Sequence, residues 1–401
     1  MFSRGPSVEG IEAHFLSQIN ATIGKAPVSG QDAAAAIEQQ ATQVAELFSA
    51  FAAQTTKTLD VCIYDFRLTI PAVSGIVVRA INDAAERSIA VRVAYDKTQD
   101  DGDILKQFAG AGGDPAPTGT HRFLTSAPLH PAVQLKAVLE EGIDPSSQIM
   151  HNKYMVADGK TPDARVWMGS ANFTVDAWAL QENNVLVVRS PELAAAYARD
   201  FDDLWVAGHL AGTGVNDTGT VSVHGTDVEY AFAPGEGKTI EQLIATTIAA
   251  AKKRIRVASM VASSAPILQA LKAAIEAGID VAGVYDYGES HGVVTGYRNR
   301  AADPKTRDPA AETAKADLIE SVLDHLVAKH SLPITKEHPD WAHNLMHDKI
   351  LVADDIVVTG SFNFSTNATR NAENVLRVSH PGLADAYTDY IDGLVKRYKT
   401  A

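Results

Sequence analysis

Two short motifs in the sequence place a histidine and a lysine two residues apart. They read HNKYMVAD and HDKILVAD, and they contain His151, Lys153 and Asp158 in the first copy and His347, Lys349 and Asp354 in the second. A neutral imidazole can act as a nucleophile or as a proton donor and acceptor near pH 7. Residues two apart in a strand point to the same face. We therefore expect both side chains of each pair to face one reacting group.

A Gly-Ser-x-Asn motif follows each histidine motif after a further apolar run. The two copies, GSANFT and GSFNFS, contain Gly169, Ser170 and Asn172, and Gly360, Ser361 and Asn363. The run KILVA predicts a buried strand, and the next apolar run predicts a hairpin whose far end returns beside the histidine. The hairpin turn is five residues longer in the first copy, which costs little at a hairpin tip.

A glutamate follows each of these motifs at the same distance. Glu182 lies thirteen residues after Gly169, and Glu373 lies thirteen residues after Gly360. Both precede an asparagine and an apolar strand, so the spacing predicts that they occupy equivalent positions. A carboxylate beside each imidazole would fix its tautomer and raise its basicity. The alternative is a glutamate at a helix end or facing solvent.

The two motif sets belong to a longer internal repeat. Tyr95 and Tyr285 end similar apolar runs 190 positions apart, and the same offset relates Tyr197 to Tyr387 in two helical patterns. Alternating helical and apolar strand patterns predict a duplicated α/β fold. We expect a first domain over 1–205, a linker over 206–226 that could include a short strand, and a second domain over 227–401.

Composition and charge limit the class of protein. The chain has 401 residues, 46% of them hydrophobic and 21% charged, and a formal net charge of −14. This acidity disfavours binding to an extended nucleic-acid duplex. The single cysteine, Cys62, excludes an intrachain disulfide. No signal peptide or membrane span is predicted, so we expect a cytoplasmic monomer, or a secreted protein if a leader has been removed.

Two stretches without a repeat partner, 97–150 and 287–346, are candidates for the walls of a pocket. Apolar residues of the first could line an acyl pocket or belong to its core: Phe108, Phe123, Leu124 and Leu129. The second contains a basic and aromatic cluster that could hold a phosphate chain or form an ordinary solvated loop: Tyr297, Arg298, Arg300, Lys305 and Arg307.

The H-x-K-x-x-x-x-D and G-S-x-N motifs, each present twice, resemble those of the phospholipase D superfamily. The resemblance covers nearly the whole chain, although the first hairpin turn is long and the second is one residue shorter than usual. It implies two similar α/β sandwich domains, related by a pseudo-two-fold axis, with one active site between them. It also implies a phosphodiesterase that forms a covalent phosphohistidine and needs no metal or cofactor.

The same resemblance implies a role for each motif residue. His151 would be the nucleophile and His347 the general acid and base, with Glu182 and Glu373 supporting the imidazoles. Non-bridging oxygens would be bound by Lys153, Lys349, Asn172, Asn363, Ser170 and Ser361. Asp158 and Asp354 would be structural.

The residues leave the substrate open. We expect a phospholipid-type or small phosphodiester, which could be hydrolysed or transferred to an alcohol; the alternatives are a metal-independent nuclease acting on single-stranded nucleic acid and a non-catalytic scaffold. A metal site at His338, His343 and His347 is disfavoured, because the first half has no counterpart.

Overall fold

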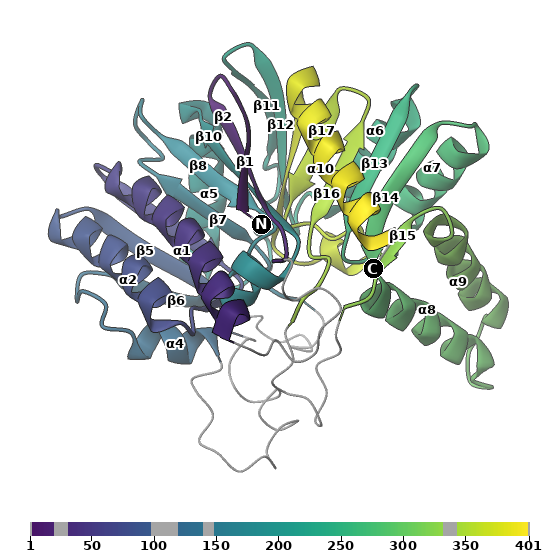
Figure 1. The fold of residues 1–401 in the computed structure, drawn as a ribbon, viewed down its shortest axis with the longest axis horizontal. Coiled ribbons are helices and arrows are strands. Elements are labelled where there is room, and N and C mark those ends of the chain that lie inside the picture. Colours follow the sequence, from purple (N-terminus) through teal and green to yellow (C-terminus); the bar gives the residue numbers. More distant parts are fainter. Residues whose placement is uncertain (1, 20–30, 98–118, 139–147, 332–342, 400–401) are drawn as a thin grey trace.

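Figure 1 shows a computed structural model of the chain as two similar halves that face each other. The structure describes residues 2–19, 31–97, 119–138, 148–331 and 343–399. In this part of the chain, no helix is both long and apolar enough to cross a membrane.

Each half is built on an eight-stranded mixed sheet, and the two sheets have the same strand order. The first, in spatial order, consists of β1 (Phe2–Val8), β2 (Ile11–Leu16), β10 (Asn183–Arg189), β8 (Arg165–Gly169), β7 (Lys153–Ala157), β3 (Thr58–Ile63), β5 (Ala90–Asp96) and β6 (Gln134–Val138). The second consists of β11 (Thr218–Val223), β12 (Thr226–Ala233), β18 (Glu373–Ser379), β17 (Ile356–Gly360), β16 (Lys349–Ala353), β13 (Arg254–Ser259), β14 (Asp280–Asp286) and β15 (Val327–Lys329). A two-stranded sheet joins β4 (Phe66–Arg67) to β9 (Phe173–Thr174). The duplicated α/β fold predicted from the repeat is therefore confirmed.

The segment expected to link the domains, 206–226, contains β11. This strand pairs with β12 at the edge of the second sheet, as β1 pairs with β2 in the first. The short strand suspected in this segment is therefore part of the second sheet.

Helices cover both faces of each sheet (Figure 1). The first half contains α1 (Gln31–Ala53), α2 (Pro71–Glu86), α4 (Thr120–Ser126), the π-helical turn η2 (Asp176–Leu180) and α5 (Pro191–Ala207). The second contains α6 (Gly237–Ala250), α7 (Ala265–Glu276), α8 (Tyr287–Ala302), α9 (Pro309–Leu323), the 3₁₀ turn η3 (Asn367–Thr369) and α10 (Pro381–Lys399). Helices α1 and α2 pack on the outer face of the first sheet, and α6, α7 and α9 pack on that of the second. Helices α5 and α10 lie on the inner faces.

The inner faces share one hydrophobic core that draws residues from both halves. The repeat tyrosines cross this interface in a symmetric way. Tyr197 on α5 donates a hydrogen bond to Asn374, and the hydroxyl of Tyr387 on α10 accepts one from Asn184, at 3.2 and 2.8 Å. Buried hydrogen bonds of this kind fix the relative position of two packed surfaces. The halves are therefore docked about a pseudo-two-fold axis.

The two unmatched stretches are largely structural where they are described. In the first, Leu124 is buried in the outer core and Phe123 and Leu129 pack against it, while Phe108 lies outside the described residues. In the second, helices α8 and α9 form a hairpin. Arg298 pairs there with Asp317 and Glu320, and Arg300 pairs with Glu312. These ion pairs engage two of the charges that could hold a phosphate chain.

Candidate active site

The two motif histidines are held by the backbone of the opposite half. The residue before His151 forms an isolated parallel bridge with Ala372, and the residue before His347 forms the equivalent bridge with Glu182. The His151 N–H donates to the Ala372 carbonyl at 2.9 Å, and the His347 N–H donates to the Glu182 carbonyl at 3.0 Å. Both histidines are 5% exposed. The docking of the halves therefore brings the two motifs into one site.

The motif lysines start the central strands β7 and β16. All five residues of each strand are buried, as their apolar sequence predicts. The Lys153 ammonium donates to the His151 carbonyl at 2.7 Å, and Lys349 bonds the His347 carbonyl in the same way. Lys153 also lies 5.0 Å from the centre of the Tyr64 ring, which packs against His151. Burial lowers the pKa of Lys153 to about 7, although Glu373 acts in the opposite direction.

The two imidazoles have different partners at Nδ1. Nδ1 of His151 lies 2.9 Å from both carboxylate oxygens of Glu373. Nδ1 of His347 lies 2.9 Å from Oδ1 of Asn183. The Asn183 amide nitrogen donates to the Ala177 carbonyl and to the Gln181 side chain, which turns Oδ1 toward His347. Because both partners accept, Nδ1 carries hydrogen in each ring and Nε2 is the atom available for chemistry.

Glu182 and Glu373 were expected to occupy equivalent positions, but they do not. Val185 pairs with Gly169, and Val375 pairs with Gly360, so Asn183 is the structural counterpart of Glu373. The segment from Gly169 to Val185 is one residue longer than the segment from Gly360 to Val375. The longer segment contains the π-helical turn η2, where the second half has η3. A π-helical turn accommodates a single inserted residue. Counting from the glycine alone therefore missed Asn183, and the ENN sequence in place of EN was the available signal.

The Glu182 carboxylate accordingly lies away from both imidazoles. It accepts hydrogen bonds from the Gln18 N–H at 3.1 Å, from Arg397 at 3.3 Å and from the Tyr398 hydroxyl. Its carboxylate is fully buried beside the positively charged Arg397 of α10. Glu182 therefore joins the first half to the last helix of the second.

Each motif serine bonds the side chain that accepts a hydrogen bond from a histidine Nδ1. The Ser361 hydroxyl donates to Glu373 at 2.6 Å, and the Ser170 hydroxyl donates to Asn183 at 2.8 Å. Each hydroxyl oxygen also accepts from the N–H of the next strand residue, Asn374 or Asn184, at 3.0 Å. A hydroxyl has one hydrogen to donate, and here that hydrogen is already used. The expected binding of phosphate by the serines is thus replaced by positioning of the histidine partners.

The glycines of these motifs are required by a close backbone approach. A Cβ at Gly169 would lie 2.2 Å from the Asn184 carbonyl oxygen, and one at Gly360 would lie 2.1 Å from that of Asn374. Any side chain would force the strands apart. The motif asparagines, Asn172 and Asn363, are over nine-tenths buried, and their Oδ1 atoms have no partner within the described residues.

The motif aspartates point away from the histidines, into the turns that start β3 and β13. Asp158 accepts from the N–H groups of Thr56, Lys57 and Thr58 at 2.6–3.1 Å. Asp354 accepts from three N–H groups in the same arrangement, those of residues 252–254, at 2.7–3.0 Å. Both aspartates have positive φ, of 57° and 50°. They organise local backbone, as expected of structural residues.

Burial controls the charge state of the site. It lowers the pKa of His151 to about 4, although Glu373 acts in the opposite direction. It also lowers the pKa of His347, and nearby Lys349 and Lys153 lower it further. Both imidazoles are therefore neutral near pH 7 before an anion binds. A phosphodiester bound between Lys153 and Lys349 would favour the protonated forms of the imidazoles and of the lysines.

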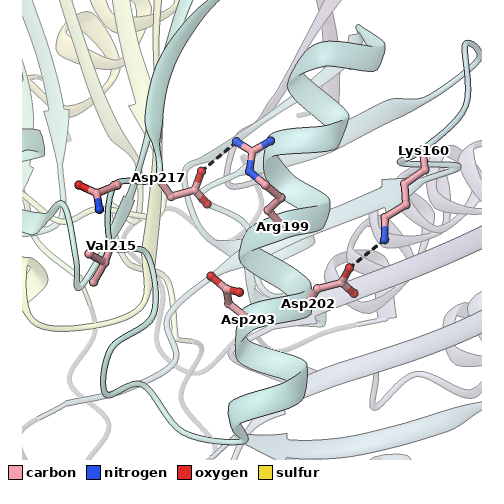
Figure 2. Close-up of a pocket in the computed structure, with 7 residues that line it drawn as sticks. Lys160, Arg199, Asp202, Asp203, Val215 and Asp217 are labelled. Carbon is pink, nitrogen blue, oxygen red and sulfur yellow. Dashed lines mark hydrogen bonds and ion pairs between the residues drawn. The ribbon is translucent and has the colours of Figure 1, made fainter.

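Two further features of the described chain concern metal binding and a surface hollow. Within the described chain, no group of three or more His, Cys, Asp and Glu side chains could hold a metal ion, and His338 falls outside it. A hollow of about 270 Å³, seen in close-up in Figure 2, has none of the motif histidines in its lining, which consists of Lys160, Arg199, Asp202, Asp203, Val215, Asn216 and Asp217. Its charges pair with one another, Arg199 with Asp217 and Lys160 with Asp202.

Comparison with known proteins points to one family. The model of the cardiolipin synthase, phospholipase D-like domain matches residues 49–205 and 244–395. Mitochondrial cardiolipin hydrolase of Xenopus laevis is 37% identical over 62 residues, 16% of this chain and 28% of that protein. The enzyme of the same name from Chlamydomonas reinhardtii is 26% identical over 160 residues, 39% of this chain and 56% of that protein. The matches span about half or less of these relatives.

A solved structure has the same fold. Phosphatidylserine synthase of Haemophilus influenzae Rd KW20 superposes with a TM-score of 0.58 at 15% identity, over 89% of this chain and 85% of that one. At this identity the likeness concerns the fold.

Proposed function

The chain belongs to the phospholipase D superfamily, and on that premise we propose that it is a phosphodiesterase that works through a covalent phosphohistidine. The observation that carries the proposal is the pair of buried imidazoles, each of which receives an Nδ1 partner from the opposite half. This arrangement leaves two Nε2 atoms to divide the roles of nucleophile and proton donor.

In the first step, Nε2 of His151 attacks phosphorus and the bond to the leaving alcohol breaks. His347, which carries hydrogen on both ring nitrogens once the anionic diester is bound, gives the proton on Nε2 to the leaving oxygen. The phosphorylated ring of His151 is cationic, because Nδ1 keeps its hydrogen. The Glu373 carboxylate at 2.9 Å stabilises that charge as it develops.

In the second step, a water molecule attacks phosphorus and gives a proton to Nε2 of His347. The bond between phosphorus and His151 breaks, and the ring returns to its neutral form. An alcohol in place of water would give transfer instead of hydrolysis.

The non-bridging oxygens would be bound by Lys153 and Lys349, with the side-chain amides of Asn172 and Asn363. The lysines supply positive charge when the anionic diester is bound between them, and the amides can donate through their nitrogen atoms. Ammonium groups held on rigid central strands need little rearrangement during the reaction.

The substrate we propose is a phospholipid-type or small diester. The matched family model and both curated relatives carry names that refer to cardiolipin. The net charge of −14 and the ion-paired state of Arg298 and Arg300 speak against a nucleic-acid groove on α8.

The substrate class is tested by incubating the protein with cardiolipin vesicles, phosphatidylcholine vesicles and single-stranded DNA, with His151→Asn as the blank. Release of phosphatidate or a free head group is the expected result. Cleavage of DNA alone would overturn the lipid proposal. Turnover of a chromogenic phosphodiester should persist in excess EDTA, and complete loss there would contradict the metal-free mechanism.

The two histidine roles are tested by intact-mass measurement after a rapid quench. A phosphoryl adduct is expected to accumulate slowly on His347→Asn, which keeps the nucleophile but lacks the group that activates water, and no adduct is expected on His151→Asn. The reverse pattern would exchange the roles.

A further inference from the structure

The two catalytic imidazoles are bonded to groups of different charge. Glu373 and Asn183 occupy equivalent positions and both accept a hydrogen bond of 2.9 Å from a histidine Nδ1. A carboxylate stabilises an imidazolium by its charge, whereas an amide oxygen accepts the same hydrogen bond as a neutral dipole. Both groups fix a tautomer, but only Glu373 also favours a positively charged ring.

The amide at this position is held firmly. Asn183 is fully buried, and Ser170, Ala177 and Gln181 bond both ends of its side chain. Rotation of the amide would place its nitrogen against the His347 N–H and lose these bonds. The structure therefore keeps an acceptor without charge beside His347.

The surroundings of His347 add positive charge. Lys349 on β16 and Lys153 on β7 act on its ring, and both disfavour its protonated form. The imidazoles of His151 and His343 lie near it as well, but burial lowers the pKa of each, so they add little charge near neutral pH.

The nearby carboxyl groups are directed elsewhere. Glu373 bonds His151, and Asp348 accepts a hydrogen bond of 2.8 Å from Tyr390 on α10. The carboxylate of Glu289 on α8 interacts electrostatically with Lys349 and favours the charged form of that lysine.

Resting on the proposed function, we propose that Asn183 is a positioning residue that fixes the tautomer of His347 without stabilising its cation, so that His347 takes up its catalytic proton together with the anionic diester. The free protein then holds two neutral imidazoles. Binding of the diester supplies the negative charge that a carboxylate would otherwise provide. The same difference suits His151, beside Glu373, to the cationic phosphohistidine.

The test is the pH profile of kcat/KM on a chromogenic phosphodiester, because this ratio reports the ionisation of the free enzyme. In Asn183→Asp, the alkaline limb is expected to move upward by about one pH unit or more, so that kcat/KM at high pH rises about tenfold relative to the unaltered protein. Asn183→Ala is expected to lower kcat without moving the limb upward, because it removes the tautomer control and adds no charge. An active Asn183→Asp variant with an unmoved limb would overturn the proposal.

Glu182→Gln is the matched control, because it changes the charge of the neighbouring residue, whose carboxylate faces Arg397. It should leave the limb in place. A shift as large as that of Asn183→Asp would mean that long-range charge, and not the contact at Nδ1, governs His347.

A second measurement does not depend on turnover or on a variant. NMR titration of the His347 ring in the unaltered protein should show a neutral imidazole down to acidic pH, and saturating inorganic phosphate should raise its pKa. Titration near the ordinary value of about 6.5 without phosphate would overturn the proposal. If no diester is turned over, the proposed function fails, while the NMR titration still decides whether His347 is neutral in the free protein.

Discussion

Nδ1 of His151 lies 2.9 Å from both carboxylate oxygens of Glu373, which belongs to the other half of the chain. The equivalent bond runs in the opposite direction, from His347 to Asn183. Each half thus supplies an imidazole and orients the imidazole of its partner. The Nδ1 partner of each histidine comes from the other half, so the proposed chemistry depends on the docking of the two inner faces.

Loss of the Glu373 charge should reduce catalysis with little change in stability. Glu373→Gln keeps the size of the side chain but no longer stabilises the cationic ring of phosphorylated His151. We expect kcat to fall by about 10²-fold or more. Steady-state kinetics on a chromogenic diester, together with a thermal melt, measure both quantities. An unchanged kcat would remove Glu373 from the mechanism.

The substitution Glu182→Gln, one position before Asn183, should instead reduce stability with little change in catalysis. Glu182→Gln leaves Arg397 without its buried carboxylate partner, so we expect a loss of about 1.5–3 kcal/mol in the free energy of unfolding. Activity per folded molecule should remain, because the Glu182 side chain does not bond an imidazole. Urea denaturation and kinetics at matched folded fractions distinguish the two effects. A drop in kcat as large as that of Glu373→Gln would restore Glu182 to the site.

The contrast between these glutamates shows how far the sequence alone could go. The repeat predicted the duplicated α/β fold, because an offset of 190 at both ends of a unit requires two copies of one topology. The spacing of two residues predicted that His347 and Lys349 share a face. The partner of His347 was not predictable by counting, because one inserted residue in η2 shifts Glu182 out of the site and Asn183 into it. Chain spacing does not reveal whether an extra residue is absorbed before or after a functional position.

The structural role of the motif aspartates predicts a loss of stability without a loss of chemistry. Asp158→Ala leaves three backbone N–H groups near Thr56 without their acceptor, so we expect a cost of about 3 kcal/mol or more. The catalytic rate of the remaining folded protein should be unchanged. Denaturant unfolding and kinetics check this, and a stable but inactive variant would contradict it.

Asp354, the counterpart of Asp158, should make stability depend on acid pH. Burial opposes its ionisation, but the N–H groups of residues 252–254 outweigh burial and lower its pKa. A carboxyl with a lower pKa in the folded state stabilises fully above its unfolded value of about 3.9, and this stabilisation is lost as pH falls through the folded value. Asp354→Asn should therefore flatten the acid unfolding profile. Identical profiles would contradict the assignment.

Asp348 should destabilise the protein at neutral pH, in contrast to Asp354. It is fully buried, and burial raises its pKa to about 7. Between about pH 4 and 7 the unfolded chain has released this proton while the folded chain keeps it. The unfolded state therefore binds fewer protons, so the free energy of unfolding falls as pH rises through this window and levels off above it.

The equivalent position in the first half shows which substitution removes this effect. The Tyr64 N–H bonds the carbonyl of Asn152, and the Met260 N–H bonds that of Asp348, so Asn152 is the counterpart. An amide at position 348 still accepts from the Tyr390 hydroxyl. Asp348→Asn should thus be more stable than the unaltered protein at pH 8, by about 2–4 kcal/mol, with little difference near pH 4. Urea denaturation at both pH values measures this, and two curves that stay parallel would show that the Asp348 carboxyl is ionised in the folded protein.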